Sequence, residues 1–245
     1  MGQDKPSSGR PQEQAAASAP DDRTPEQTAS DASHPSLAAG DAEHVKRHAR
    51  ARFERWACSY DRSLLTELVF LPSVRACQAE IARWQAERGG RPFRILDVGC
   101  GTGSLLAVLA TDELAELLLG LDYAKQMVRR ASDKFSHAEG AEKLRAVRGD
   151  SERLPLADAS FDVVTCCNSF HHYPHQAETM REFRRVLRPG GLLVLIDGFR
   201  DNVIGWVVFD VGVALVEKHV HHASWSELHR MIQLNKPVFL HQSQK

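Results

Sequence analysis

The sequence has 245 residues, of which 42% are hydrophobic and 26% are charged, and its formal net charge is −1. This length fits one domain of ordinary size with appendages, and the composition is typical of a globular protein. The near-zero charge excludes a global field that would draw the chain to nucleic acid or to an anionic membrane.

Cysteine usage and the apolar stretches bear on the cellular compartment. The five cysteines, at positions 58, 77, 100, 166 and 167, form neither a CxxC pair nor a disulfide framework. No signal-peptide pattern opens the chain, and the longest apolar stretch, 203–216, is too short to span a bilayer. We therefore expect a reduced, cytoplasmic protein without a membrane span.

The first 44 residues differ in composition from the rest of the chain. Residues 1–44 hold no aromatic residue and are rich in Ala, Ser, Pro, Gln and Asp. Such a segment buries too little apolar surface to offset its ordering entropy, which predicts a disordered tail. The basic run HVKRHARAR at 44–52 is interpreted as the solvated start of a helix in preference to a phosphate contact.

Residues 45–90 carry helical patterns that predict a helical cap. Phe53, Trp56, Ala57 and Tyr60 recur at helical spacing. A second helical pattern covers about 73–88 and stops at Gly89-Gly90, where glycine favours a helix end.

Strands and helices alternate through the domain predicted over 91–245. Continuous apolar strands separated by helices indicate a doubly wound α/β fold, with a mostly parallel sheet covered on both faces. Strands are predicted at 94–98, 117–121, 144–148, 161–167, 192–197 and 238–241, and helices at 104–114, 124–138, 175–188, 202–218 and 224–234. Ligands of such sheets bind at the carboxyl ends of the strands.

The first predicted strand runs into ILDVGCGTG at 95–103, which has the pattern D-x-G-x-G-x-G. Its glycines permit tight turns and close approach of a ligand to the backbone. The third glycine of a dinucleotide fingerprint is absent, because Ser104 stands where the frame starting at Gly99 requires it. Asp97 at the mouth of the loop suits a ligand that brings a cation, such as an amino group.

Acids also follow the second and third strands. Asp122 is placed to accept hydrogen bonds from a ribose diol, although it could instead cap the next helix. Asp150 and the backbone N–H of Ser151 are placed to recognise a base, although Asp150 could be an ordinary turn acid. Three acids at three consecutive strand ends favour the binding interpretation.

The fourth strand leads into NSFHHYPH at 168–175, where the reacting group of a bound cofactor would point. His171 and His172 are candidate general bases, because imidazole titrates near neutral pH. For each histidine taken singly, a packing or solvated role is slightly favoured over the role of general base.

Four motifs in order resemble the class I S-adenosylmethionine-dependent methyltransferases. They are ILDVGCGTG, the acid in GLD, GDSERLPLADASFDVV and REFRRVLRPGGLLVLID. The resemblance is closest to the small-molecule and lipid branch that includes ubiquinone and menaquinone pathway enzymes. It covers about 91–200 closely and FERWACSYD at 53–61 loosely, and it implies a Rossmann-like fold that binds S-adenosyl-L-methionine.

The resemblance also implies a role for each matching residue. The loop after the first strand would hold the methionine part, Asp122 the ribose, and Asp150 with Ser151 the adenine. Asn168 would lie beside the methionine carboxyl and sulfonium, and Tyr60 would close over the cofactor. The cofactor-binding set is then Asp97, Gly99, Cys100, Gly101, Gly103, Asp122, Tyr123, Asp150, Ser151, Asn168 and Tyr60.

The end of the chain departs from the family pattern of seven strands with an antiparallel final pair. One candidate strand, Val238–His241, follows the fifth, so the seventh strand is expected to be missing. An exposed inner strand edge would result. The chain is truncated, its end is divergent, or a partner such as a second copy completes the sheet.

The segment 217–229 is rich in histidine. Glu217, His219, His221, His222 and His229 are metal-ligand types, but their spacing is not that of a metal site, and a surface or acceptor-site role is favoured. Asp197, Gly198 and Phe199 are expected to line the acceptor pocket, and 203–216 to pack on the sheet.

The leading hypothesis is methyl transfer to a small-molecule or lipid acceptor. Nucleic-acid adenine methylation is disfavoured, because Asn168-Ser169-Phe170-His171 lacks the Pro-Pro-aromatic sequence usual for it. A non-catalytic cofactor-binding scaffold or regulator stays open as an alternative. A nicotinamide dehydrogenase is disfavoured by the absent third glycine.

Overall fold

A computed structural model describes residues 39–57, 71–197, 225–234 and 239–240. They belong to one compact unit that spans Leu37–Lys245. Cys58, Tyr60, Gly198, Phe199 and the predicted helix at 202–218 lie outside the described residues. Within the described ranges, no helix combines the length and apolar character needed to cross a membrane.

Six strands form one sheet in the order β3-β2-β1-β4-β5-β6, and each neighbouring pair is parallel. The strands are β1 (Phe93–Val98), β2 (Ala115–Asp122), β3 (Leu144–Arg148), β4 (Phe161–Cys167), β5 (Leu187–Ile196) and β6 (Phe239–Leu240). The order reverses between β1 and β4, which is where doubly wound sheets bind ligands.

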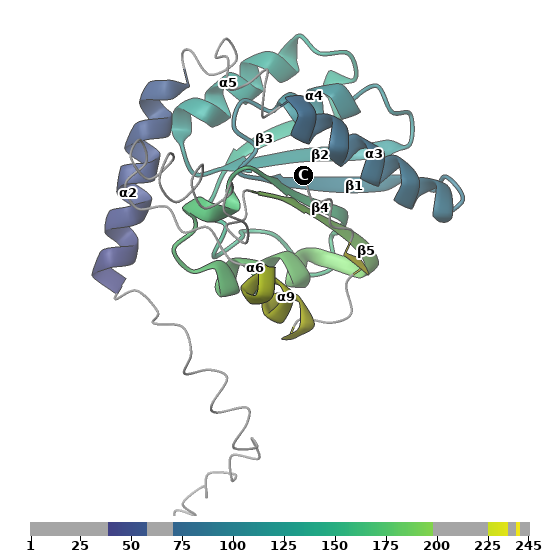
Figure 1. Cartoon of the computed structure of the whole chain (residues 1–245). Coiled ribbons are helices and arrows are strands. Elements are labelled where there is room, and N and C mark those ends of the chain that lie inside the picture. The colour runs from purple at the N-terminus through teal and green to yellow at the C-terminus, as the bar shows by residue number, and fades with distance from the viewer. Residues whose placement is uncertain (1–38, 58–70, 198–224, 235–238, 241–245) are drawn as a thin grey trace, which may run out of the picture. The chain divides into compact units, whose positions relative to one another are not determined.

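Helices cover both faces of the sheet (Figure 1). The α-helices are α2 (Ala39–Trp56), α3 (Leu71–Glu87), α4 (Ser104–Leu109), α5 (Lys125–Ser136), α6 (Gln176–Val186) and α9 (Trp225–Leu234), and the short 3-10 helices are η3 (Ala141–Lys143) and η4 (Phe170–His172). Helices α3, α4 and α5 share one core cluster with the sheet, and α6 and α9 share the other. The predicted Rossmann-like α/β fold with an N-terminal helix is confirmed.

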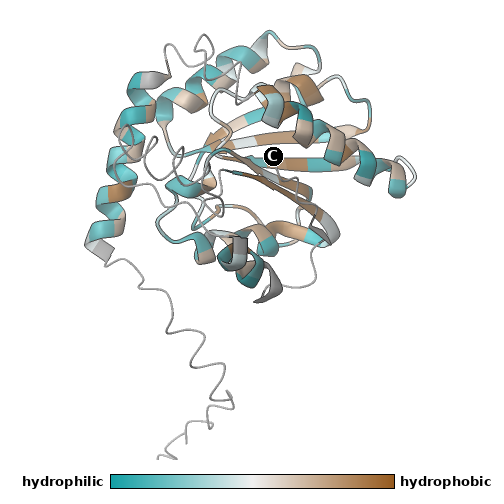
Figure 2. Ribbon diagram, in the orientation of Figure 1, coloured by the Kyte–Doolittle hydropathy of each residue, from teal (hydrophilic) through white to brown (hydrophobic). Residues whose placement is uncertain are grey.

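Alternation along the strands explains the two core clusters. Leu96 and Val98 belong to the cluster under α6, whereas Phe93 and Ile95 belong to the cluster under α3. Successive strand residues point to opposite faces, so an apolar strand supplies both cores at once. Figure 2 shows the resulting hydrophobic strands between helices whose outer surfaces are hydrophilic.

Most predicted elements are present, with shifts at their ends. The bounds of β3 and β4 agree with the sequence prediction, whereas α4 stops at Leu109 instead of 114. Strand β5 begins at Leu187 and includes the predicted turn RPGG, across which its register with β4 shifts. Helix α2 begins at Ala39, inside the segment predicted to be disordered, because Asp41 favours the helix N-terminus and Ala42 is buried.

The last strand lies directly beside β5. In β6, Phe239 pairs with Leu192 and Leu240 with Leu193, both in parallel register. The described residues contain six strands and no antiparallel seventh.

Two glycines of the loop after β1 are required by the packing of the protein itself. A Cβ on Gly99 would collide with Ser169 and Tyr173, and one on Gly103 would lie 2.5 Å from the Phe135 ring. Both residues have positive φ, +73° and +76°. Their missing side chains therefore let the loops after β1 and β4, and helix α5, approach one another.

Substitution of Gly103 tests this packing constraint. Gly103→Ala adds both backbone strain and overpacking, so we expect the free energy of unfolding to fall by about 3 kcal/mol. Gly89→Ala is the matched control, because Gly89 has a similar φ of +70° but open space around a Cβ. It isolates the strain, about 1 kcal/mol. If urea denaturation showed the same loss in the free energy of unfolding for both variants, the packing constraint at Gly103 would be contradicted.

Candidate active site

A cavity of about 780 Å³, counting its open mouth, lies at the carboxyl ends of the central strands. This volume is within the usual range for small-molecule sites. Its lining includes seven of the predicted cofactor residues, namely Gly99, Gly101, Asp122, Tyr123, Asp150, Ser151 and Asn168. Parallel strands with aligned ends therefore bring side chains together that are distant in sequence.

The loop after β1 is fastened to the end of β2 by backbone hydrogen bonds. The N–H groups of Gly99 and Cys100 donate to the Leu121 carbonyl at 2.8 and 3.1 Å. The N–H of Gly101 donates to Asp122 Oδ2 at 2.9 Å. The first wall of the cavity is thus built by the protein without a ligand.

Asp122 is half-buried at the end of β2. Its Oδ1 accepts a 2.8 Å hydrogen bond from the Ala124 N–H at the start of α5, so the predicted alternative of a capping role is present in the structure. Burial raises the pKa of Asp122 to about 6, against the lowering effect of the backbone hydrogen bonds. Each oxygen still has acceptor capacity for a hydroxyl.

Asp97 lies in β1, directly before the loop, and is 4% exposed. Its Oδ1 accepts a 2.7 Å hydrogen bond from the Thr165 hydroxyl on β4. Burial raises the pKa of Asp97 to about 7, and the nearby Asp122 adds to the rise against the Thr165 hydrogen bond. A buried acid of this kind is stabilised in its charged form by a cationic group.

Asp150 and Ser151 follow β3 at the cavity wall. Asp150 Oδ1 accepts from the Glu152 N–H at 3.0 Å, the geometry of the turn acid kept open as an alternative. Its Oδ2 accepts from Lys46 Nζ at 2.7 Å. Ser151 is buried and lines the cavity.

The loop after β4 contributes a strained asparagine and two histidines. Asn168 has φ +54°, and its N–H donates to the Ile196 carbonyl at 2.7 Å. His172 lines the cavity, with its ring 5.0 Å from that of Phe53. The ring of His171 lies 4.0 Å from the ring of His172.

His171 is paired with Asp197, the residue that follows β5. The two are joined through His171 Nδ1 and Asp197 Oδ1 at 2.5 Å, and the His171 N–H donates to Oδ2 at 2.8 Å. Because an ionised carboxylate only accepts hydrogen bonds, this contact favours the His171 tautomer with its proton on Nδ1. The sequence suggested each residue singly, but not the pair.

Some predicted site residues do not line the cavity. Asp97, Cys100, Gly103 and His171 are absent from its lining, and Tyr60 lies outside the described residues. Cys100 packs against Gly120, where a Cβ would lie 2.8 Å from its sulfur, and Gly103 faces Phe135. Cys100 and Gly103 thus support the loop through packing contacts outside the cavity.

The sequence analysis missed the contribution of α2 to the cavity. Lys46, Arg50 and Phe53 line it from this helix. The side chain of Lys46 is 16% exposed and paired with acids, so the interpretation of the basic run as a solvated helix start is wrong at this position. The spacing of 46, 50 and 53 on one helix face was the available signal.

No group of three or more metal-ligating side chains occurs within the described ranges. His229 falls on α9, but the other members of the histidine-rich segment, from Glu217 to His222, lie outside these ranges. The favoured surface or acceptor-site role for that segment stays a prediction.

Comparison with known proteins identifies one family that resembles the central part of the chain. Residues 96–195 match the family described as a methyltransferase domain. The region from 96 to 195 is therefore similar to methyltransferase domains, in keeping with the resemblance to the class I S-adenosylmethionine-dependent methyltransferases. The matched range runs from β1 to β5 and so contains the strand ends that form the cavity.

Three relatives illustrate the similarity. The uncharacterized methyltransferase YcgJ of Bacillus subtilis is 34% identical in sequence, over 60% of this chain and 57% of YcgJ. The crystal structure of YcgJ superposes on this chain with a TM-score of 0.54 at 30% identity. This superposition covers 59% of this chain and 61% of YcgJ. Demethylmenaquinone methyltransferase of Listeria monocytogenes is 30% identical over 63% of each chain. The 27-O-demethylrifamycin SV methyltransferase of Amycolatopsis mediterranei is 38% identical over 42% of this chain and 38% of its own. The chain thus spans less than two thirds of each relative.

The buried acid of β1 gives a pH-dependent prediction. The pKa of Asp97 is raised in the native state, so its ionisation opposes folding increasingly from about pH 4 and fully above about pH 7. Asp97→Asn removes this cost, and we expect it to raise the free energy of unfolding by about 1–3 kcal/mol more at pH 8 than at pH 5.

Urea denaturation at the two pH values measures the difference. Asp133→Asn, which removes an exposed carboxyl on α5, is the control and should change stability by less than about 0.5 kcal/mol at either pH. The same gain for Asp97→Asn at both pH values would show that Asp97 titrates normally in the native state.

Proposed function

We propose that this protein transfers a methyl group from S-adenosyl-L-methionine to a hydroxyl group of a small-molecule or lipid acceptor. The pairing of His171 with Asp197 beside the cavity is the observation that carries this proposal. A hydroxyl must lose its proton as it is methylated, and an imidazole oriented by a buried carboxylate suits that task.

The chemistry of the cavity fits the cofactor. Asp97 and the loop after β1 would hold the methionine part, since a buried acid with a raised pKa favours an ammonium partner. Asp122 would accept from the ribose hydroxyls, and Asp150 with the Ser151 N–H would recognise adenine. When bound, S-adenosyl-L-methionine supplies a methyl group already activated on a sulfonium.

The protein then has to orient the acceptor and receive its proton. Asp197 holds the imidazole of His171 through Nδ1, and the proton of the acceptor hydroxyl would go to Nε2. His172 and Phe53 pack edge to face at the cavity wall and help to exclude water. Orientation of this kind accounts for about 7–11 kcal/mol of a barrier in well-aligned reactions.

The acceptor class is supported by the names of two relatives. One is named for demethylmenaquinone and the other for 27-O-demethylrifamycin SV, both small molecules. These names belong to the relatives, and the acceptor of this chain is part of the proposal.

Transfer of a labelled methyl group tests the proposed function. Purified protein is incubated with S-adenosyl-L-methionine carrying a tritiated methyl group and a panel of phenols, hydroquinones and sugar alcohols. For the acceptor that gains label, we expect His171→Asn to lower kcat by about 10²–10⁴. Its affinity for S-adenosylhomocysteine should stay within about threefold of wild type, because His171 does not line the cavity.

His172→Asn is the matched comparison, since it alters the neighbouring imidazole, which lines the cavity. A larger loss of kcat for His172→Asn than for His171→Asn would transfer the role of base to His172. Tight cofactor binding with no methylated acceptor of any class would favour the alternative of a non-catalytic scaffold.

A further inference from the structure

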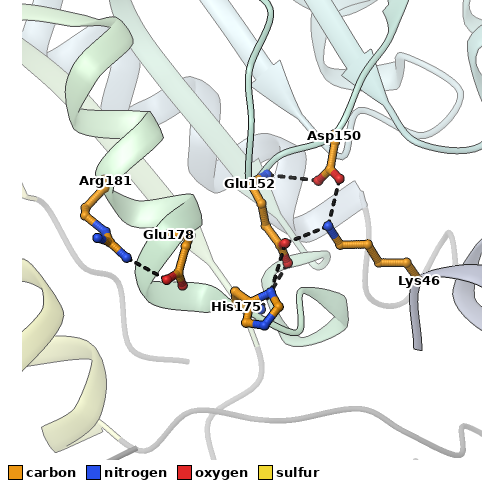
Figure 3. A network of polar contacts seen from close by, with 6 residues as sticks. All are labelled: Lys46, Asp150, Glu152, His175, Glu178 and Arg181. Carbon is orange, nitrogen blue, oxygen red and sulfur yellow. Dashed lines mark hydrogen bonds and ion pairs between the residues drawn. The ribbon is translucent and has the colours of Figure 1, made fainter. Parts of the chain in front are cut away.

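Lys46 reaches from α2 to two acids that follow β3. Its Nζ lies 2.7 Å from Asp150 Oδ2 and 2.6 Å from Glu152 Oε2 (Figure 3). The side chains of Lys46 and Glu152 are only 16% and 11% exposed. Burial alone lowers the pKa of Lys46, but the hydrogen bonds to the two acids outweigh it and raise the pKa. The ion pair of Lys46 with Glu152 is therefore largely shielded from water, unlike an ordinary surface ion pair, whereas the Asp150 side chain is 33% exposed.

The far end of this ion pair is anchored on the loop after β4. Glu152 Oε1 accepts from the His175 N–H at 3.0 Å, and Oε2 is 3.0 Å from His175 Nδ1. The Glu152 N–H in turn donates to Asp150 Oδ1. Figure 3 shows Asp150 and Glu152 converging on Lys46 while His175 lies against Glu152. Both oxygens of Asp150 thus have a fixed partner.

Helix α2 is held over the cavity at a second point. Glu54, two turns after Lys46, accepts from the N–H groups of Lys125 and Gln126 at 2.8 and 3.0 Å. These are the first N–H groups of α5, which favour a carboxylate partner. Because Glu54 fixes the other end of the cavity-lining face, Lys46 approaches Asp150 from a set direction.

We propose that Lys46 is a positioning and specificity-determining residue for the adenine ring, because it fixes the orientation of the Asp150 carboxylate. The inference rests on the proposed cofactor site. A carboxylate has about four acceptor positions. The contacts from Lys46 and from the Glu152 N–H leave others for an exocyclic amine. A base with a carbonyl in place of that amine meets a fixed acceptor and is rejected.

Discrimination between two cofactor analogues tests the inference. Calorimetric titration compares S-adenosylhomocysteine with S-inosylhomocysteine, which differs by a carbonyl in place of the adenine amine. We expect wild-type protein to prefer the adenosyl compound, and Lys46→Met to reduce the ratio of the two dissociation constants by about tenfold. Lys46→Arg should restore most of the preference. Arg47→Met, which removes an exposed cation from the same helix, should leave the ratio unchanged.

The outcomes separate this inference from the proposed function. An undiminished preference in Lys46→Met, or tighter binding of S-adenosylhomocysteine by that variant, would overturn the positioning role. The second result would mean that Lys46 competes with adenine for Asp150. If Lys46→Met does not fold, Glu152→Gln supplies the test, because it weakens the anchor of Lys46, and an unchanged ratio would again overturn the role. Binding of neither compound by folded wild-type protein would overturn the proposed function as well.

Discussion

The parallel alignment of β1 with β2 and β4 is the constraint on which the site depends. Asp97 pairs with Gly120 on one side and with Thr165 on the other. This register places the strand ends side by side, so the residue after each strand enters the same cavity. It also brings the Thr165 hydroxyl to the Asp97 carboxyl. The apolar alternation that fills both cores fixes the register, because a slip of one residue would turn every core side chain to the wrong face.

The same edge of the sheet concentrates carboxyl groups that the core keeps from water. Asp97 and Asp122 have pKa values raised by burial, and their proximity makes the ionisation of Asp97 harder still. Perturbed acids of this kind gather at functional sites. The cost of ionising these acids therefore lowers the free energy of unfolding of the protein. A ligand that brings an ammonium and hydroxyl groups would offset this cost. At Asp150, a third acid of this edge, Lys46 of the chain itself supplies the cation.

The central part of the site was predictable because its signals are local. Asp122 and Asp150 follow apolar runs, and topology alone places them at one edge. The pairing of Lys46 with Asp150 joins residues 104 positions apart and leaves no trace in either local sequence. His171 and Asp197, 26 positions apart, were each identified for other reasons, and only the fold shows that they meet. Long-range pairs of polar side chains depend on how elements dock, which periodicity does not encode.

Calorimetric titration of S-adenosylhomocysteine into the purified chain tests the central claim, that the strand ends form a cofactor site. The account predicts micromolar binding that Asp122→Ala abolishes or weakens strongly. Glu139→Ala, which removes an exposed carboxyl outside the cavity, should bind as wild type does. Circular dichroism establishes that each protein is folded. Failure of the folded wild-type chain to bind, or equal binding by Asp122→Ala, would contradict the account.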